Sequence, residues 1–161
     1  MKTLLHLSIL SLLTTSVIAQ CLDDQAHNTS INSVWMSCNL SPNPFAEIGD
    51  SHWIMYEFEQ VESIESINLW NINNPNQLTS GAQRIRMDIS PDGATWTNMG
   101  VFEVAMADAS EDYTGELMAD FEAFEGRYIL FTILANHGGP CSGIGEVRLS
   151  LIHISEPTRP Y

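Results

Sequence analysis

Short apolar runs alternate with clusters of glycine, proline, asparagine and aspartate along most of the chain. Helical periodicity is nearly missing, and this rhythm is typical of an all-β sandwich or barrel. Ile85, Met87 and Ile89 alternate with charged residues, so their strand is expected to bury one face and expose the other. The run 128–134 is apolar on both faces, which predicts a central strand. The segments expected to form strands are 53–58, 64–72, 83–90, 101–106, 117–121, 128–134 and 144–148.

The segment from Ser90 to Trp96 carries the strongest local signal. Pro91 and Asp92 favour a tight turn, and Gly93 can adopt the positive φ that such a turn needs. We therefore expect the chain to reverse there and to form a β-hairpin from residues 84–89 and 96–106.

Residues 1–19 have the layout of a secretory signal peptide, with one lysine, an apolar stretch and a small-residue ending at Ala19. We expect cleavage before Gln20 and a secreted or cell-surface product. An uncleaved anchor is disfavoured because the apolar stretch is short and interrupted by Ser and Thr. Lipid attachment at Cys21 is disfavoured because Gln20 is bulkier than the small residue that such a cleavage site prefers.

The last residues of the sequence, 149–161, are interpreted as foreign to the native protein. Leu149 to Arg159 matches, in frame, the translation of a transposase adaptor that is used in sequencing libraries. We therefore expect residues 149–161 not to be native and exclude them from functional argument, as a fusion scar would be. The folded domain is then expected to span residues 20–148, and further domains could follow it in the native protein.

Composition and charge restrict the classes of partner. Residues 20–148 have the length of one domain with its own core. The chain holds 6 basic and 20 acidic residues, for a formal net charge of −14. Such a surface repels nucleic acid and anionic membranes, because both are bound through Lys and Arg. We expect neither as a partner and interpret the acidity chiefly as an aid to solubility in a salty medium.

Three sequence strings together resemble the discoidin or coagulation factor 5/8 type C family. They are the turn at 90–96, the string Gly126-Arg127-Tyr128 before an apolar strand, and the string 143–148. The resemblance extends from about Ala26 to Arg148. It implies a galactose-binding-like jelly roll, a β-sandwich of about eight antiparallel strands whose loops at one end do the binding.

The same resemblance helps to place the tryptophans. Trp96 occupies the position of a packing residue in the family, and Trp53 opens an expected strand, so both are expected in the core. Trp70 ends a strand beside Asn71, and the sequence leaves its position open.

Export to an oxidising compartment permits one disulfide among the 3 cysteines of the chain. In the family, the segment around Trp35 lies beside the last strand, which implies a bond between Cys38 and Cys141. The alternative pairs Cys21 with Cys141 and would join the two ends of the domain.

Carbohydrate-binding relatives hold a structural calcium ion with an N-terminal loop and a glutamate of the last strand. Aligning the sequence on Trp35 places these residues on the loop pattern: Ala26, Asn28, Ser30 and Ser33. The resemblance thus implies Ca²⁺ bound by Asn28, Ser33 and Glu146, since Ca²⁺ takes oxygen ligands. Asn28 replaces an aspartate of the pattern, which weakens the expected site. The alternative is that Asn28 belongs to a turn and Glu146 to an ordinary surface position.

The stretch from Asn71 to Gln77 is rich in amides and leaves an expected strand. Amides donate and accept hydrogen bonds, as the recognition of sugar hydroxyls requires. An exposed phenylalanine can stack on a sugar ring, with imidazoles beside it. We therefore expect a glycan site formed by Asn71, Asn74, Phe45, His52 and His137. The alternative is that the amides belong to ordinary long turns.

Catalysis is not expected. No serine or cysteine nucleophile motif accompanies His52 or His137, and two histidines without a clear third ligand make a poor zinc site. The expected function is therefore that of a secreted glycan-binding or adhesion module, with a glycan or glycoprotein as partner. The alternative is a protein–protein interaction module of a larger secreted enzyme or surface protein.

Overall fold

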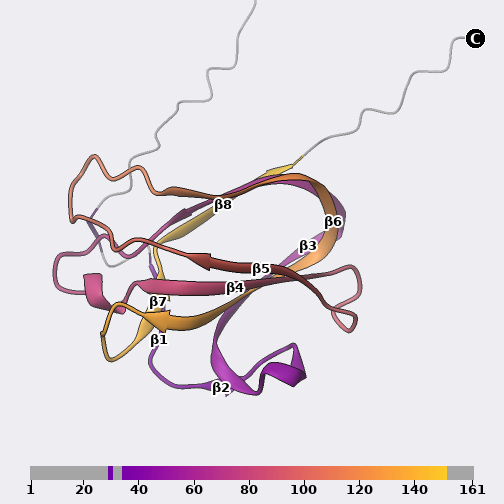
Figure 1. Ribbon diagram of the computed structural model, residues 1–161, viewed down its shortest axis with the longest axis horizontal. Helices are drawn as coiled ribbons and strands as arrows, with labels where there is room; N and C mark the ends of the chain where they lie inside the picture. Colours follow the sequence, from indigo (N-terminus) through magenta and orange to yellow (C-terminus); the bar gives the residue numbers. More distant parts are fainter. Residues whose placement is uncertain (1–28, 31–33, 152–161) are drawn as a thin grey trace, which may run out of the picture.

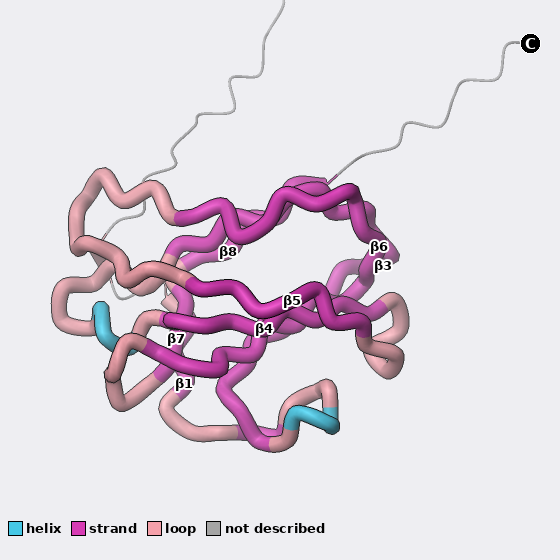
Figure 2. The backbone as a smooth tube through the Cα atoms, in the orientation of Figure 1, coloured by secondary structure: helices cyan, strands magenta, loops and turns pink. Residues whose placement is uncertain are grey.

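The computed structural model describes residues 29–30 and 34–151, and within these ranges it contains strands and short 3-10 helices but no α-helix (Figure 1). The strands are β1 (Trp35–Ser37), β2 (Ser41–Pro42), β3 (Asp50–Trp70), β4 (Ala82–Ser90), β5 (Thr97–Glu103), β6 (Glu116–Asn136), β7 (Ser142–Ile144) and β8 (Glu146–Leu151). The short helices η2 (Ala46–Ile48) and η3 (Leu78–Ser80) lie in connections, well apart from each other (Figure 2). No described helix has the length and apolar character that crossing a bilayer requires.

The long strands β3 and β6 curl together from one layer of the sandwich to the other (Figure 1). The first half of β3 pairs with the second half of β6, and the register shifts between Glu57 and Glu62 before the pairing continues. The sequence predicts separate strands at 53–58 and 64–72, and at 117–121 and 128–134. In the structure the two segments of each pair belong to one continuous strand. The residues that connect the two segments keep an extended conformation through the bend.

One layer has the strand order β2-β3-β6-β4-β5, while β8 pairs with the second half of β3 and β1 pairs with β7. All these pairings are antiparallel. The strand β6 lies between β3 and β4, which confirms the predicted central strand. The all-β sandwich is likewise confirmed. The pairing of β8 with β3 extends to Leu151, beyond the expected domain end at Arg148.

The core fills the space between the layers, with fully buried side chains that include Ile64, Ile67, Met87, Ile129 and Phe131. Ile85, Met87 and Ile89 are all buried, as their alternation predicts. Trp70, whose position the sequence leaves open, is buried. Trp53 and Trp96 differ from expectation, because both stay partly exposed outside the core cluster. The physical reason for Trp96 is that its ring stacks on Phe45 instead.

Asp92 organises the hairpin turn. Its Oδ1 accepts hydrogen bonds from the backbone N–H groups of Thr95 and Ala94, at 2.7 and 2.9 Å, and from the Ser90 hydroxyl at 3.0 Å. Gly93 has a φ of 75°, as the sequence predicts. The backbone donors stabilise the charged carboxylate, and they lower the pKa of Asp92 from 3.8 to about 2.

We expect the Asp92→Asn variant to lose less thermal stability than the wild type between about pH 5 and about pH 2. Folding lowers this pKa, so the carboxylate stabilises the fold above its unfolded-state pKa, and this contribution is lost as the pH falls toward 2. Thermal unfolding followed by circular dichroism at each pH measures the effect. The Pro91→Ala variant is the control, because it changes the same turn without a titrating group. Parallel pH profiles for wild type and Asp92→Asn would contradict the prediction.

Candidate functional site

Three connections meet at one end of the sandwich, on the left in Figure 1: residues 71–81, 104–115 and 137–141. Backbone hydrogen bonds join the first to the third, since Gly139 N donates to Thr79 O at 2.8 Å and His137 N donates to Gly81 O at 3.1 Å. We call these three segments the loop end.

Asn71 is fully buried beneath the loop end. Its Nδ2 donates to the carbonyl oxygens of Ala82 and Ala105, both at 2.8 Å, and its Oδ1 accepts from Ile72 N at 3.0 Å. Its backbone N–H donates to the Tyr113 hydroxyl at 3.1 Å. The amide is thus fully used inside the protein. The predicted ligand contact by Asn71 is therefore corrected: the residue fixes the 104–115 loop against the start of β4.

Asn73 and Asn74 also bind neighbouring backbone. Asn73 Nδ2 donates to Ser110 O at 2.7 Å, which attaches the 104–115 loop a second time. Asn74 Nδ2 donates to Thr29 O at 2.9 Å, and its Oδ1 accepts from Asn76 N at 3.0 Å. Asn74 lies in the loop end, as expected, and its role as a ligand contact stays a prediction.

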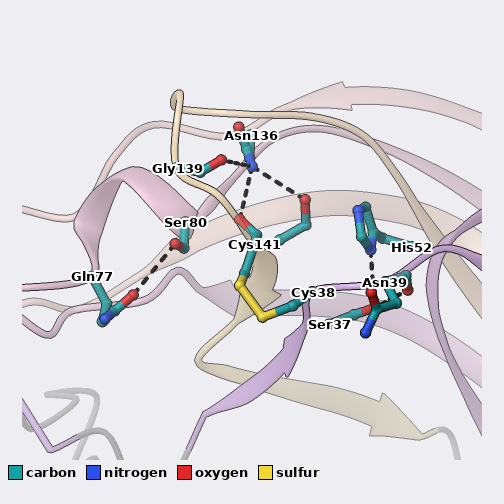
Figure 3. The surroundings of a disulfide bond; sticks show 10 residues. Ser37, Cys38, Asn39, His52, Gln77, Ser80, Asn136, Gly139 and Cys141 are labelled. Atoms are coloured by element: carbon teal, nitrogen blue, oxygen red, sulfur yellow. Dashed lines mark hydrogen bonds between the residues drawn. A yellow bond between two sulfur atoms is a disulfide. The ribbon is translucent and has the colours of Figure 1, made fainter.

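His137 connects the third loop to the second. Its Nε2 lies 3.1 Å from Val104 O, and since a carbonyl oxygen only accepts, this ring nitrogen carries the proton. The neighbouring Asn136 donates from Nδ2 to Gly139 O and Cys141 O, at 3.0 and 2.7 Å (Figure 3). His137 is half-buried at the loop end, and its contact with a ligand stays a prediction.

Phe45 does not reach the loop end. It directly precedes η2, which Figure 2 shows far from η3 of the loop end. Its ring stacks on Trp96 with 6.3 Å between centroids, and the Arg86 guanidinium lies 5.3 Å from its ring centre. The prediction of one site containing both Phe45 and the amide-rich loop is therefore corrected, because the fold separates them and the ring packs on its own neighbours.

The disulfide joins Cys38 to Cys141, 103 residues apart in sequence, which confirms the bond that the family resemblance implies (Figure 3). The alternative bond between Cys21 and Cys141 is thereby excluded. The bond attaches the segment after β1 to the segment before β7, which pair with each other.

His52 lies beside this disulfide, with its Nδ1 2.9 Å from the Ser37 hydroxyl oxygen (Figure 3). The Ser37 hydroxyl donates its single proton to Asn39 O at 3.0 Å. The imidazole is therefore the donor to serine, which is the reverse of a serine nucleophile activated by a basic histidine. This geometry supports a structural role for His52, and its contact with a ligand stays a prediction.

The calcium ligands expected from the resemblance are only partly described, because Asn28 and Ser33 lie outside the described residues. The described member, Glu146, accepts a hydrogen bond from Arg148 Nε at 2.6 Å. A guanidinium in this position opposes a cation at the same carboxylate. Within residues 29–30 and 34–151, no three His, Cys, Asp or Glu side chains group as a metal site. Because the other two expected ligands lie outside the described residues, the calcium site stays a prediction.

Sequence reasoning missed the 104–115 loop, which supplies Ser110 and Tyr113 to the contacts above. Burial raises the pKa of the Tyr113 phenol, so its hydroxyl stays neutral while it accepts the hydrogen bond from Asn71. The length of the connection between the expected strands 101–106 and 117–121 was the available signal, because long connections often carry function. The sequence did not reveal the role of Asn136, because its neighbours in sequence do not show whether an amide binds backbone carbonyl groups or water.

The outward-facing parts of the loop end are mainly polar, and Met106 adds one large exposed apolar side chain to them. The exposed residues there include Pro75, Asn76, Thr79, Asp108, Glu111, Asp112 and Gly138. Their amide, hydroxyl and carboxylate groups can exchange hydrogen bonds with a polyhydroxyl ligand. The braces beneath them hold the backbone in one arrangement, so binding there does not require the loops to be ordered first.

No family model matches the sequence, and no curated protein matches it. Solved structures do match. The CBM32-3 module from a family 31 glycoside hydrolase of Clostridium perfringens has a TM-score of 0.54 and 14% identity, covering 81% of this chain and 82% of that chain. The chain has the CBM32 fold. The likeness is in structure far more than in sequence, and it confirms the discoidin-like architecture.

Two other structures extend the comparison. A pectin binding carbohydrate binding module matches with a TM-score of 0.52 and 17% identity, over 86% of this chain and 83% of that chain. The CBM32-1 and CBM32-2 domains of Clostridium perfringens ZmpB, solved in complex with GalNAc, match with a TM-score of 0.51 and 15% identity. That match covers 78% of this chain and 28% of the longer one. The CBM32 fold therefore occurs as one module of longer proteins.

We expect the Asn71→Ala variant to lose about 2–3 kcal/mol of unfolding free energy, because the buried carbonyl of Ala82 and the partly buried carbonyl of Ala105 lose their donor. Urea unfolding measures the loss. Gln60→Ala is the matched control, since it removes an exposed amide from β3 and should change stability by less than about 0.5 kcal/mol. Equal stabilities of the two variants would show that the Asn71 amide does not hold the loops.

Proposed function

We propose that this chain is a non-catalytic, extracellular module that binds glycans through its loop end. One observation carries the proposal: the structure gathers three polar loops at one end of a fold shared with carbohydrate-binding modules. One of those structures holds GalNAc and another is described as pectin binding. The internal bracing of the loops supports the proposal, because rigid loops bind a small, hydroxyl-rich ligand without a large loss of entropy.

The proposed location and context rest on separate features. The Cys38–Cys141 bond fits an oxidising compartment, as the expected signal peptide does. Similar modules belong to longer proteins, one of them a glycoside hydrolase. We therefore place this module in a larger secreted or cell-surface protein, where it would hold a partner domain close to a glycan.

A glycan array with the folded full chain tests the proposal. We expect selective binding to a sugar class and a loss of at least about tenfold in affinity for the loop-end variants Asn76→Ala and His137→Ala. Gln60→Ala removes an equally exposed amide near the strand bend and should bind normally. A blank array from a folded sample would contradict glycan binding and favour a protein partner.

The calcium prediction is tested in the same assay with added Ca²⁺ and with a chelator. Calcium bound by Asn28, Ser33 and Glu146 would supply positive charge that fixes the N-terminal segment beside the last strand. Binding and melting temperature should then both fall in chelator, and Glu146→Gln should remove the difference. Identical melting curves with and without chelator would show that no calcium is held.

A further inference from the structure

The arginines of residues 29–30 and 34–151 all make contacts within the protein. Lys2 is the only lysine of the sequence. Each arginine of the described ranges pairs with a carboxylate: Arg84 with Glu103 at 3.3 Å, Arg86 with Asp88 at 2.8 Å, Arg127 with Glu57 at 2.7 Å and Arg148 with Glu146 at 2.6 Å. An incoming anion would therefore compete with a carboxylate that is already in place.

Three of these guanidinium groups also cover an aromatic ring of the protein. Their carbon atoms lie 5.3 Å from the centre of Phe45, 5.2 Å from Tyr128 and 4.7 Å from Trp70, for Arg86, Arg127 and Arg148 respectively. Both the donor edge and the flat face of each group thus contribute to internal packing.

The loop end itself carries negative charge. Asp108, Glu111 and Asp112 are exposed on the 104–115 loop. The hydrogen bond from Asn73 to Ser110 O, at 2.7 Å, holds this acidic segment against the amide-rich loop. A ligand bound at the loop end would therefore meet these carboxylates.

We propose that the module is selective for uncharged glycans and excludes glycans that carry carboxylate or sulfate groups. The inference rests on the proposed glycan-binding function and names its ligand class. An acidic group on a bound glycan is repelled by nearby exposed carboxylates unless a cation compensates its charge. The arginines of the described ranges could supply that cation, but they are already paired with carboxylates of the protein. The pectin binding module has only 17% identity to this chain, so its ligand does not decide the question.

The test uses the full chain and matched glycan pairs whose members differ only in their acidic groups. The pairs are lactosamine with and without sialic acid, galactan with and without sulfate, and oligogalacturonides as free acid and methyl ester. At about 0.02 M salt we expect the protein to bind the uncharged member of a pair about tenfold or more tightly than the acidic member. Raising the salt to about 0.5 M should reduce this difference in affinity.

Two charge variants locate the effect. Glu111→Gln/Asp112→Asn removes two charges from the loop end, and Glu59→Gln/Glu65→Gln removes two exposed charges from β3. The first should raise the affinity for the acidic member about threefold or more, and the second should leave it nearly unchanged. Equal effects of the two variants, or an acidic member bound as tightly as its partner, would overturn the inference. A blank for both members of every pair would instead contradict glycan binding itself, and this inference with it.

Discussion

Removing the disulfide with the Cys38→Ala/Cys141→Ala double variant is expected to lower the free energy of unfolding by about 4–5 kcal/mol. The bond closes a loop across 103 residues, so in the chain-entropy model its loss releases most of the unfolded chain from a constraint. Most single domains are stable by only about 5–15 kcal/mol, so this loss removes a large share of the total. Urea unfolding of both proteins at the same temperature measures the difference.

Reduction of the wild-type protein provides the control for this prediction. A thiol reductant should lower wild-type stability to the level of the double variant and should leave the variant unchanged. Because β1 and β7 are short and form a two-stranded sheet of their own, the loss should also reach the loop end, where Asn136 binds Cys141 O. A loss below about 1 kcal/mol would show that β-sheet pairing alone fixes the Cys141 segment.

Replacing Arg86 by methionine is expected to cost about 2–4 kcal/mol of unfolding free energy. Asp88 is fully buried on the face of β4 that the sequence pattern predicts to be exposed. Arg86 donates to both of its carboxylate oxygens, and Asn98 Nδ2 donates at 3.0 Å. Methionine fills similar space but leaves the buried carboxylate without its cation, which is costly when water cannot replace it. Arg86 is itself partly exposed, so the cost lies below that of a fully buried pair.

Two further variants make this prediction specific. Arg84→Met breaks an exposed pair with Glu103 and should cost no more than about 1 kcal/mol. The double variant Arg86→Met/Asp88→Leu removes both charges and should recover most of the loss, because no buried charge is left unpaired. Urea unfolding at neutral pH compares the three proteins. A double variant no more stable than Arg86→Met would show that Arg86 acts through its packing on Phe45.

The sequence predicts much of the fold because strand periodicity is a local property. The alternation at 85–89, the turn at Asp92 and the apolar strand at 128–134 each follow from neighbouring residues. The continuity of β3 through its polar bend does not, since it depends on pairing with β6 far away in sequence. The burial of Asp88 does not follow from the alternation either, because the Asn98 amide that donates to its carboxylate comes from the neighbouring strand β5.

The candidate site was harder to predict for a related reason. A run of amides fits a sugar site and a set of loop braces equally well, and only the three-dimensional partners distinguish them. Asn71 binds Ala82 and Ala105, which no sequence pattern links to it. Phe45 was grouped with the amides by its chemistry, but the fold places its ring on Trp96.

The division between inward braces and outward polar residues has a consequence for engineering. Asn71 and Asn73 set where the loop backbones run, while the side chains of Asn76, Glu111 and Asp112 are exposed on the outside of the same loops. A combinatorial library restricted to such outer positions should therefore retain the architecture in most of its members. The molecule then serves as a rigid display scaffold, on which new recognition can be selected without redesigning the frame.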